Sequence, residues 1–119
     1  MTDHTERRRT IRIEVNGTLK VETASPGPAL RLVDVGMGGF SVRTPSAIAL
    51  NVVTMYRFST PNEKWSAELS ARAVHSKVLR PQGGPLEYLT GFAFVKSEAP
   101  ETQRRLMEMM DHATDMSFS

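Results

Sequence analysis

Hydrophobic and polar residues alternate in several short segments of this chain, which is the pattern of half-buried β-strands. In residues 11–15 the isoleucines and a valine share one face, and after Asn16-Gly17 the alternation resumes in residues 19–21. Asn-Gly is typical of a hairpin turn, but a glycine with positive φ also permits a bulge. Because an isolated hairpin with such short arms would be only marginally stable, we expect one long strand bent at Gly17.

Further segments that alternate, or that are rich in β-branched and aromatic residues, predict five more strands. They are expected over residues 30–35, 40–43, 52–59, 65–79 and 87–95, with turn signals rich in glycine and proline between them. In the last of these segments both faces are apolar, so we expect this strand to be covered on both sides.

The pattern changes after residue 99. Pro100-Glu101 suits the first turn of a helix. Leu106, Met109, Met110 and Ala113 then follow the spacing of one apolar helical stripe. Six strands and one helix predict an all-β fold, namely a six-stranded antiparallel β-barrel, closed or nearly closed, with a C-terminal α-helix that packs on it or caps one end.

Composition and length limit the chain to one domain. Its 119 residues leave no room for a second core, and the 39% hydrophobic and 24% charged residues are ordinary for a globular domain. We expect a mobile tail over residues 1–6, one domain over 7–114 and a tail over 115–119. No apolar run approaches the roughly 20 residues that span a bilayer, and the N-terminus does not resemble a secretory signal. A cytoplasmic protein without membrane insertion is therefore expected.

The candidate chemistry does not indicate an enzyme. The chain has no cysteine, and the histidines (His4, His75 and His112) lack metal-ligand spacing. We interpret these histidines as surface or partly buried structural residues. There is no nucleophile motif, and the carboxylates are scattered along the chain. We expect no catalytic residue, no metal and no cofactor.

Basic residues form the first feature with a possible binding role. The net charge of +2 is too small to indicate binding to a nucleic acid polymer, but Arg7, Arg8, Arg9 and Arg12 lie close together in the sequence. A guanidinium binds phosphate through two parallel hydrogen bonds and stacks on aromatic planes. Arg8 and Arg12 could thus converge on one ligand, although this run taken alone is better explained as a solvated basic tail.

The second feature is the glycine-rich segment from Asp34 to Gly39. Gly38 and Gly39 permit positive φ and a close approach of a ligand to the main chain. The carboxylate of Asp34 could accept hydrogen bonds from the N1–H and N2–H₂ groups of guanine. Taken alone, a plain hairpin in which Asp34 caps its own turn is the simpler explanation.

Together these two features resemble the signature of the PilZ family of cyclic di-GMP receptors. That signature is R-x-x-x-R followed further along by [D/N]-x-S-x-x-G. Here Arg8-x-x-x-Arg12 precedes Asp34-x-Gly36-x-x-Gly39, and Gly91-Phe92-Ala93-Phe94 resembles the G-x-x-F of the last core strand of the family. The resemblance covers roughly residues 6–113. It implies a split-barrel fold that binds the bacterial messenger cyclic di-GMP and relays it to a protein effector, whose identity the sequence does not give.

The resemblance also implies roles for single residues. Arg8 and Arg12 would contact the phosphates and stack on guanine, Asp34 would bind a guanine edge, and Gly39 would keep the turn open to the ligand. An arginine at the position of Arg7 is associated in this family with an intercalated pair of nucleotides. Binding would order the arginine-bearing segment against the barrel and present a new surface to the effector.

One position departs from the family pattern, because Gly36 stands where the family has serine. The loss of one neutral hydrogen bond lowers affinity by roughly two- to tenfold. This departure motivates an alternative, a PilZ-like protein–protein adaptor that does not bind the nucleotide and uses its methionine-bearing helix as a contact surface. A nucleic-acid-binding barrel of OB type would need exposed aromatic residues on adjacent strands, and aromatic residues make up only 7% of the chain.

Overall fold

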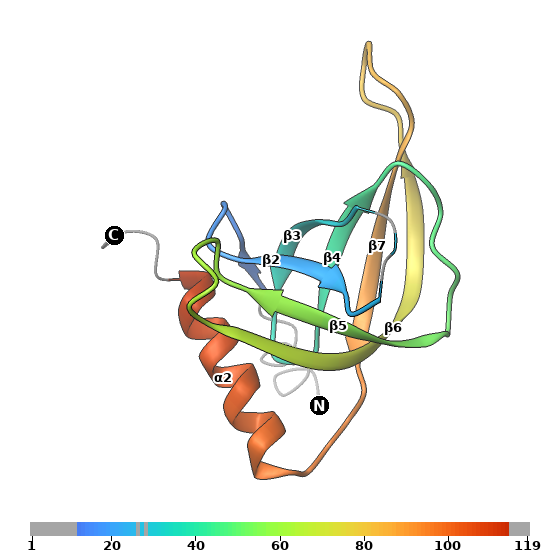
Figure 1. Cartoon of the computed structure of the whole chain (residues 1–119). Coiled ribbons are helices and arrows are strands. Elements are labelled where there is room, and N and C mark those ends of the chain that lie inside the picture. The colour runs from blue at the N-terminus through green and yellow to red at the C-terminus, as the bar shows by residue number, and fades with distance from the viewer. Residues whose placement is uncertain (1–11, 26, 28, 115–119) are drawn as a thin grey trace, which may run out of the picture.

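The computed structural model describes residues 12–25, 27 and 29–114. Over these residues the chain forms seven strands followed by one helix (Figure 1). The elements are β1 Ile13–Glu14, β2 Lys20–Thr23, β3 Arg31–Val35, β4 Gly39–Thr44, β5 Val53–Ser59, β6 Ser66–Leu79, β7 Glu87–Phe94 and α2 Pro100–Thr114. All strand pairs are antiparallel, and the order across the sheet is β1-β3-β4-β7-β6-β5-β2.

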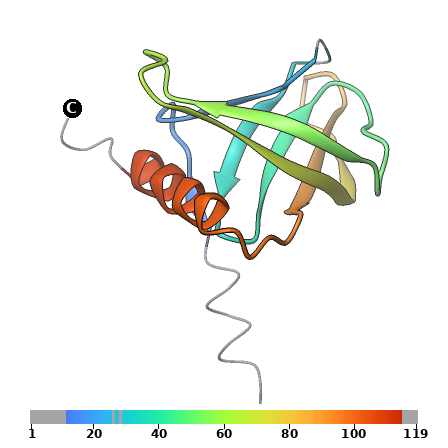
Figure 2. The ribbon, with the colours of Figure 1, turned by 60° about the horizontal axis from the view of Figure 1, so that its bottom comes forward.

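The sheet curls into a half-barrel of seven strands, which corrects the predicted count of six (Figures 1 and 2). The extra strand arises because the first predicted strand is divided at Asn16-Gly17. Its two halves, β1 and β2, lie at opposite edges of the sheet, since β1 pairs with β3 and β2 pairs with β5. Gly17 has a φ of 89°, which lets the chain bend between these edges. The two halves are therefore not the arms of a hairpin.

The core lies on the concave face of the sheet and is centred on aromatic rings. Phe40, Phe58 and Phe92 are almost fully buried, and each contributes about 1.5–3 kcal/mol of burial free energy. Phe40 and Phe92 lie on neighbouring strands and stack in parallel, with ring centroids 4.6 Å apart. The ring of Tyr56 meets both of them edge-on. Strand alternation therefore builds one continuous core.

Helix α2 packs along one side of the half-barrel (Figure 2). Leu106, Met109 and Ala113 are buried, as the apolar stripe predicted. Two hydrogen bonds fix the helix to the strands and their connections. Thr18 Oγ1 donates to the carbonyl oxygen of Ala113 at 2.9 Å, and the indole N–H of Trp65 donates to Glu108 at 3.0 Å.

The prediction that β7 is covered on both faces is wrong. Thr90, Phe92 and Phe94 are buried on the concave face, but on the convex face Leu89 and Ala93 are only half-buried. The convex face of the sheet is therefore largely open. The hairpin of β6 and β7 continues beyond the barrel as a projecting arm (Figure 1). Among the described residues, no helix is long and apolar enough to cross a membrane.

Candidate functional site

Asp34 is the centre of a polar cluster on the convex face. Its Oδ1 atom accepts a hydrogen bond from the hydroxyl of Ser41 at 2.7 Å and another from Arg12 Nη1 at 2.9 Å. The side chains of Arg12 and Asp34 keep 36% and 26% of their surface exposed, so the cluster is open to solvent. Two of the residues predicted to bind the ligand, Arg12 and Asp34, are thus in direct contact.

A β-bulge turns Asp34 toward solvent. Leu32 is opposite Val42, but the next regular pair is Asp34 with Ser41, so one extra residue lies between them in β3. Because side chains alternate between the faces of a strand, an extra residue moves the following side chain to the other face. Leu32 and Val35 therefore both enter the core, while Asp34 lies outside. Asp34 is a strand residue that bonds Ser41 and Arg12, which corrects the interpretation that it caps its own turn.

A second bulge, in β6, brings His75 to the same convex face. Ala73 is opposite Phe92 in the core, and after the irregularity His75 is opposite Gly91. Gly91 is also opposite Ser41, and Ser41 is opposite Asp34. Adjacent strands lie about 4.8 Å apart, so the row from Asp34 to His75 spans about 14 Å.

Gly91 is the smallest member of this row, and the His75 ring covers it. A Cβ atom on Gly91 would lie 2.6 Å from both Cε1 and Nε2 of His75. This contact explains why Gly91 is buried although it lies on the convex face. His75 itself is an exposed strand residue, in agreement with its interpretation as a surface histidine.

The turn after Asp34 is held by backbone hydrogen bonds. The N–H of Gly36 donates to the carbonyl oxygen of Gly39 at 2.8 Å, and the N–H of Phe94 donates to the carbonyl oxygen of Gly38 at 2.9 Å. Within the described part of the chain, the glycines with positive φ are Gly17 and Gly83, so the turn does not use its glycines in that way. Gly39 instead permits close packing, because a Cβ there would overlap with the carbonyl oxygen of Phe92.

The remaining predicted arginines, Arg7 and Arg8, lie outside the described residues, and their convergence on a ligand stays a prediction. Ser41 is a member of the cluster that the sequence analysis missed. The length of the turn could have predicted that Ser41 lies beside Asp34. Once Val35 and Phe40 are paired across the four-residue turn, Asp34 and Ser41 are the next pair outward.

Aromatic residues do not form a stacking surface for nucleic acid. Phe40, Phe58, Phe92, Phe94 and Tyr56 are buried in the core. The two other aromatic residues of the described chain, Trp65 and Tyr88, are half-buried, so none of the described aromatic residues is exposed. This distribution argues against the OB-type hypothesis, which needs exposed rings on adjacent strands.

The sequence matches no protein-family model and no curated protein. Its structure is similar to solved ones. It superimposes on the PilZ domain of YcgR from Escherichia coli, solved with c-di-GMP, with a TM-score of 0.65 at 16% identity. This similarity covers 90% of the present chain and 91% of that domain. The chain therefore has a PilZ-like fold, as its motifs predicted.

Two further structures show the same fold. MrkH of K. pneumonia, in its apo state, matches with a TM-score of 0.66 at 13% identity over 87% of this chain and 47% of MrkH. The uncharacterised Legionella protein Lpg0364 matches with a TM-score of 0.55 at 12% identity over 85% of this chain and 90% of that protein. At these identities the likeness shows the fold alone.

Proposed function

We propose that this chain is a bacterial, cytoplasmic receptor for cyclic di-GMP that binds its ligand around Asp34 and catalyses no reaction. The observation that carries the proposal is the direct hydrogen bond between Arg12 and Asp34, which are 22 residues apart in the sequence. They belong to the two separate motifs of the resemblance. The PilZ-like fold supports the proposal, because the matching domain of YcgR was solved with c-di-GMP.

The hydrogen bonds of Asp34 fit this role. Its two described partners, Arg12 and Ser41, both donate to the same oxygen, Oδ1. Among the described residues no donor bonds Oδ2, and in this proposal Oδ2 accepts a hydrogen bond from a guanine edge. A carboxylate can accept two parallel hydrogen bonds, and those that involve a charged group contribute about 1.5–3 kcal/mol each.

Arg12 would exchange partners when the ligand binds. An ion pair between exposed side chains contributes about 0–1 kcal/mol, so separating Arg12 from Asp34 costs little. The released guanidinium would then bind a phosphate of the ligand, and Asp34 would bind guanine. In this proposal Arg8 supplies the second guanidinium, and Arg7 favours an intercalated pair of nucleotides. Ser41 orients the carboxylate, although Gly36 supplies no hydroxyl at the family's serine position.

Calorimetric titration with cyclic di-GMP tests the proposal. We expect binding by the full chain, severe loss of affinity in Arg8→Ala and Arg12→Ala, and no change in the control Arg104→Ala. Arg104 is an exposed arginine on α2, far along the chain from both motifs. The stoichiometry should fall from two nucleotides to one in Arg7→Ala. The proposal fails if high-micromolar ligand produces neither heat nor NMR shift changes at Arg12, Asp34 and Ser41.

Relay to a protein effector is the second part of the proposal. The order that binding imposes on the arginine-bearing segment would create the surface that the effector recognises. The effector is an unidentified protein, and a pull-down with and without cyclic di-GMP would reveal it. Capture that does not depend on the nucleotide would contradict the relay.

The adaptor alternative is favoured by one observation, an exposed apolar patch at the start of β5. Leu50, Val52, Val53 and Met55 have relative exposures between 41% and 58%. The buried stripe of α2 is occupied by its packing on the barrel, so this patch replaces it as the candidate contact surface. An adaptor would capture its partner without cyclic di-GMP, and Val53→Ser would abolish that capture.

A further inference from the structure

The seam of the half-barrel contains a cleft. β2 and β3 approach each other there, but they are not hydrogen-bonded neighbours in the sheet. Between the bent segment of residues 14–20 and β3 lies a cavity of about 540 Å³. Sites for small molecules usually have volumes of about 300–1,000 Å³, so this cleft is large enough for one.

Two arginines that line this cleft are direct cross-strand neighbours. Arg31 in β3 is opposite Arg43 in β4. Like charges in this position destabilise a sheet unless something compensates them. Glu87 lies 3.7 Å from Arg43 and compensates it in part. No ion pair joins Arg31 to any carboxylate of the described residues, which leaves uncompensated positive charge at the cleft.

The rest of the lining is mostly apolar or already paired. Leu19 and Leu32 are buried, and Leu30 packs against the core beside them. The ammonium group of Lys20 is bound to Glu63 at 2.7 Å. Glu14 is the only carboxylate among the lining residues. The cleft thus combines an apolar wall with a pair of guanidinium groups, and this combination suits an anion that carries an apolar or ring-shaped body.

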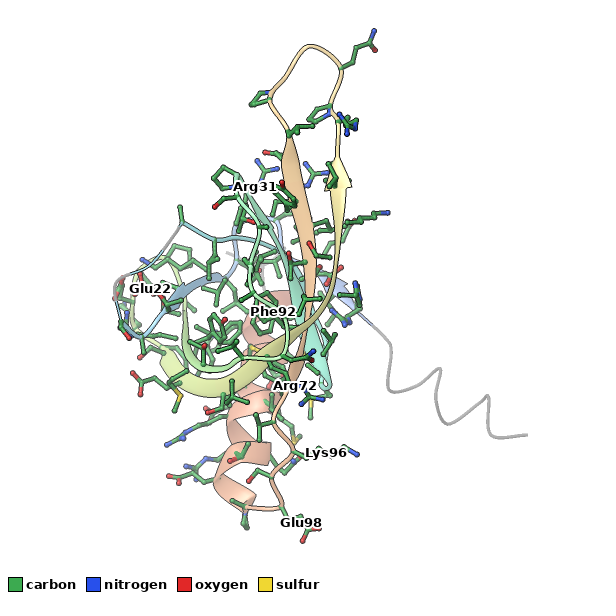
Figure 3. All side chains as sticks on the ribbon, turned by 90° about the vertical axis from the view of Figure 1, so that its right-hand side faces the viewer. Glu22, Arg31, Arg72, Phe92, Lys96 and Glu98 are labelled. Carbon is green, nitrogen blue, oxygen red and sulfur yellow. The ribbon has the colours of Figure 1, made fainter. Side chains whose placement is uncertain are left out.

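We propose that this cleft is a separate anion site for a phosphate ester or diphosphate. Two neighbouring guanidinium groups offer the forked donors that bind phosphate oxygens in pairs, and a doubly charged anion would relieve their repulsion. Arg31 lies on the side of the barrel from which the β6–β7 hairpin projects, and α2 lies on the opposite side (Figure 3). The site uses neither Arg12 nor Asp34, so it does not depend on cyclic di-GMP binding.

An NMR titration of the full chain with pyrophosphate at low ionic strength tests this proposal. We expect saturable shifts of the guanidinium signals of Arg31 and Arg43 and of the amide of Gly17. Arg31→Gln and Arg43→Gln should each weaken binding about tenfold, as expected for the loss of a charge-assisted hydrogen bond. Both variants should stay folded, because each removes one of two repelling charges. Arg104→Gln is the control and should bind like the wild type.

Three results would overturn the proposal. The first is the absence of saturable shifts at millimolar pyrophosphate. The second is binding that persists unchanged when Arg31 and Arg43 are both replaced by glutamine, because the shifts would then report nonspecific attraction. The third is loss of these shifts in Arg12→Gln, which would place the anion at the Asp34 cluster instead. A protein that binds cyclic di-GMP normally and fails these tests would contradict this inference alone.

Discussion

The backbone of Gly39 lies directly against the carbonyl oxygen of Phe92, so closely that any side chain on Gly39 would overlap with that oxygen. This contact joins the start of β4 to β7 at the point where Phe40 stacks on Phe92. The glycine that the motif resemblance assigned to the ligand therefore has a packing role in this fold. The turn that follows Asp34 is held in place by the aromatic core on the other face of the same strands.

Gly39→Ala should consequently destabilise the fold. The overlapping atom belongs to the backbone of a paired strand, so relief requires the two strands to separate, and overpacking of this kind costs about 1–3 kcal/mol. Urea denaturation with linear extrapolation measures the change in unfolding free energy. Gly84→Ala is the matched control, since its Cβ would make an ordinary contact of 3.6 Å with Pro81. Equal stability of the two variants would contradict the role given to Gly39.

Asp34→Asn should lower the affinity for cyclic di-GMP strongly but change the stability of the fold only slightly. The substitution keeps the shape of the side chain but removes its charge, and the lost ion pair with Arg12 contributes only about 0–1 kcal/mol to stability. If Asp34 binds the guanine edge, affinity for cyclic di-GMP falls far more than stability does. Calorimetry and urea denaturation on the same samples provide both values. Glu22→Gln, which removes the exposed ion pair with Arg57, is the control and should bind normally.

Ser41→Ala should have a smaller effect than Asp34→Asn. It removes one neutral donor to the carboxylate, and such a bond contributes about 0.5–1.5 kcal/mol, which corresponds to a two- to tenfold loss of ligand affinity. Ser70→Ala removes a hydroxyl from another strand, where its partner is the sulfur of Met55, and should leave affinity unchanged. If Ser41→Ala bound like the wild type, the hydroxyl would have no role in orienting Asp34.

The sequence predicted the strands well because each buries one face, but it did not predict the two bulges. Alternation places Leu32 in the core, and strict continuation would have turned Asp34 inward as well. Only the pairing across the sheet shows that one residue is added before Asp34, and another before His75. Nothing in the local residue types marks these insertions. The contact between Arg12 and Asp34, by contrast, follows from residues that the motif had already selected.

The local sequence pattern also did not predict that the first strand is divided into β1 and β2. Asn16-Gly17 indicates a change of direction, and Gly17 has the positive φ that this change requires. Which strands receive the two halves depends on residues far along the chain, because β1 pairs with β3 and β2 pairs with β5. Long-range pairing therefore determines the number of strands. Because it does not join β2 to β3, it also forms the seam that contains the cleft lined by Arg31 and Arg43.

Low pH should remove the stabilisation that the fold gains from the ion pairs of Glu63 with Lys20 and Arg57. Hydrogen bonds from Lys20 and Arg57 hold the pKa of the Glu63 carboxyl below its ordinary value of 4.5. A carboxyl whose pKa is lowered by folding stabilises the protein above its unfolded pKa, and this contribution disappears as the pH falls through the folded pKa. Glu63→Gln should therefore be less stable than the wild type at neutral pH, and the two should converge below pH 4.5. Thermal unfolding across this pH range measures the difference, with the exposed Glu98→Gln as control.

The contact between Gly91 and His75 can be tested by a double-mutant cycle. Glycine inside a strand is less favourable than alanine by about 0.5–1 kcal/mol, so Gly91→Ala would stabilise β7 if the space above it were free. In the wild type the new Cβ would lie 2.6 Å from the His75 ring, which must move away, so the gain is smaller. In a His75→Ala background the space is free, and Gly91→Ala should raise the unfolding free energy. Residues in contact give a nonzero coupling energy in such a cycle. Additive effects of the two substitutions would show that the ring does not cover Gly91 in solution.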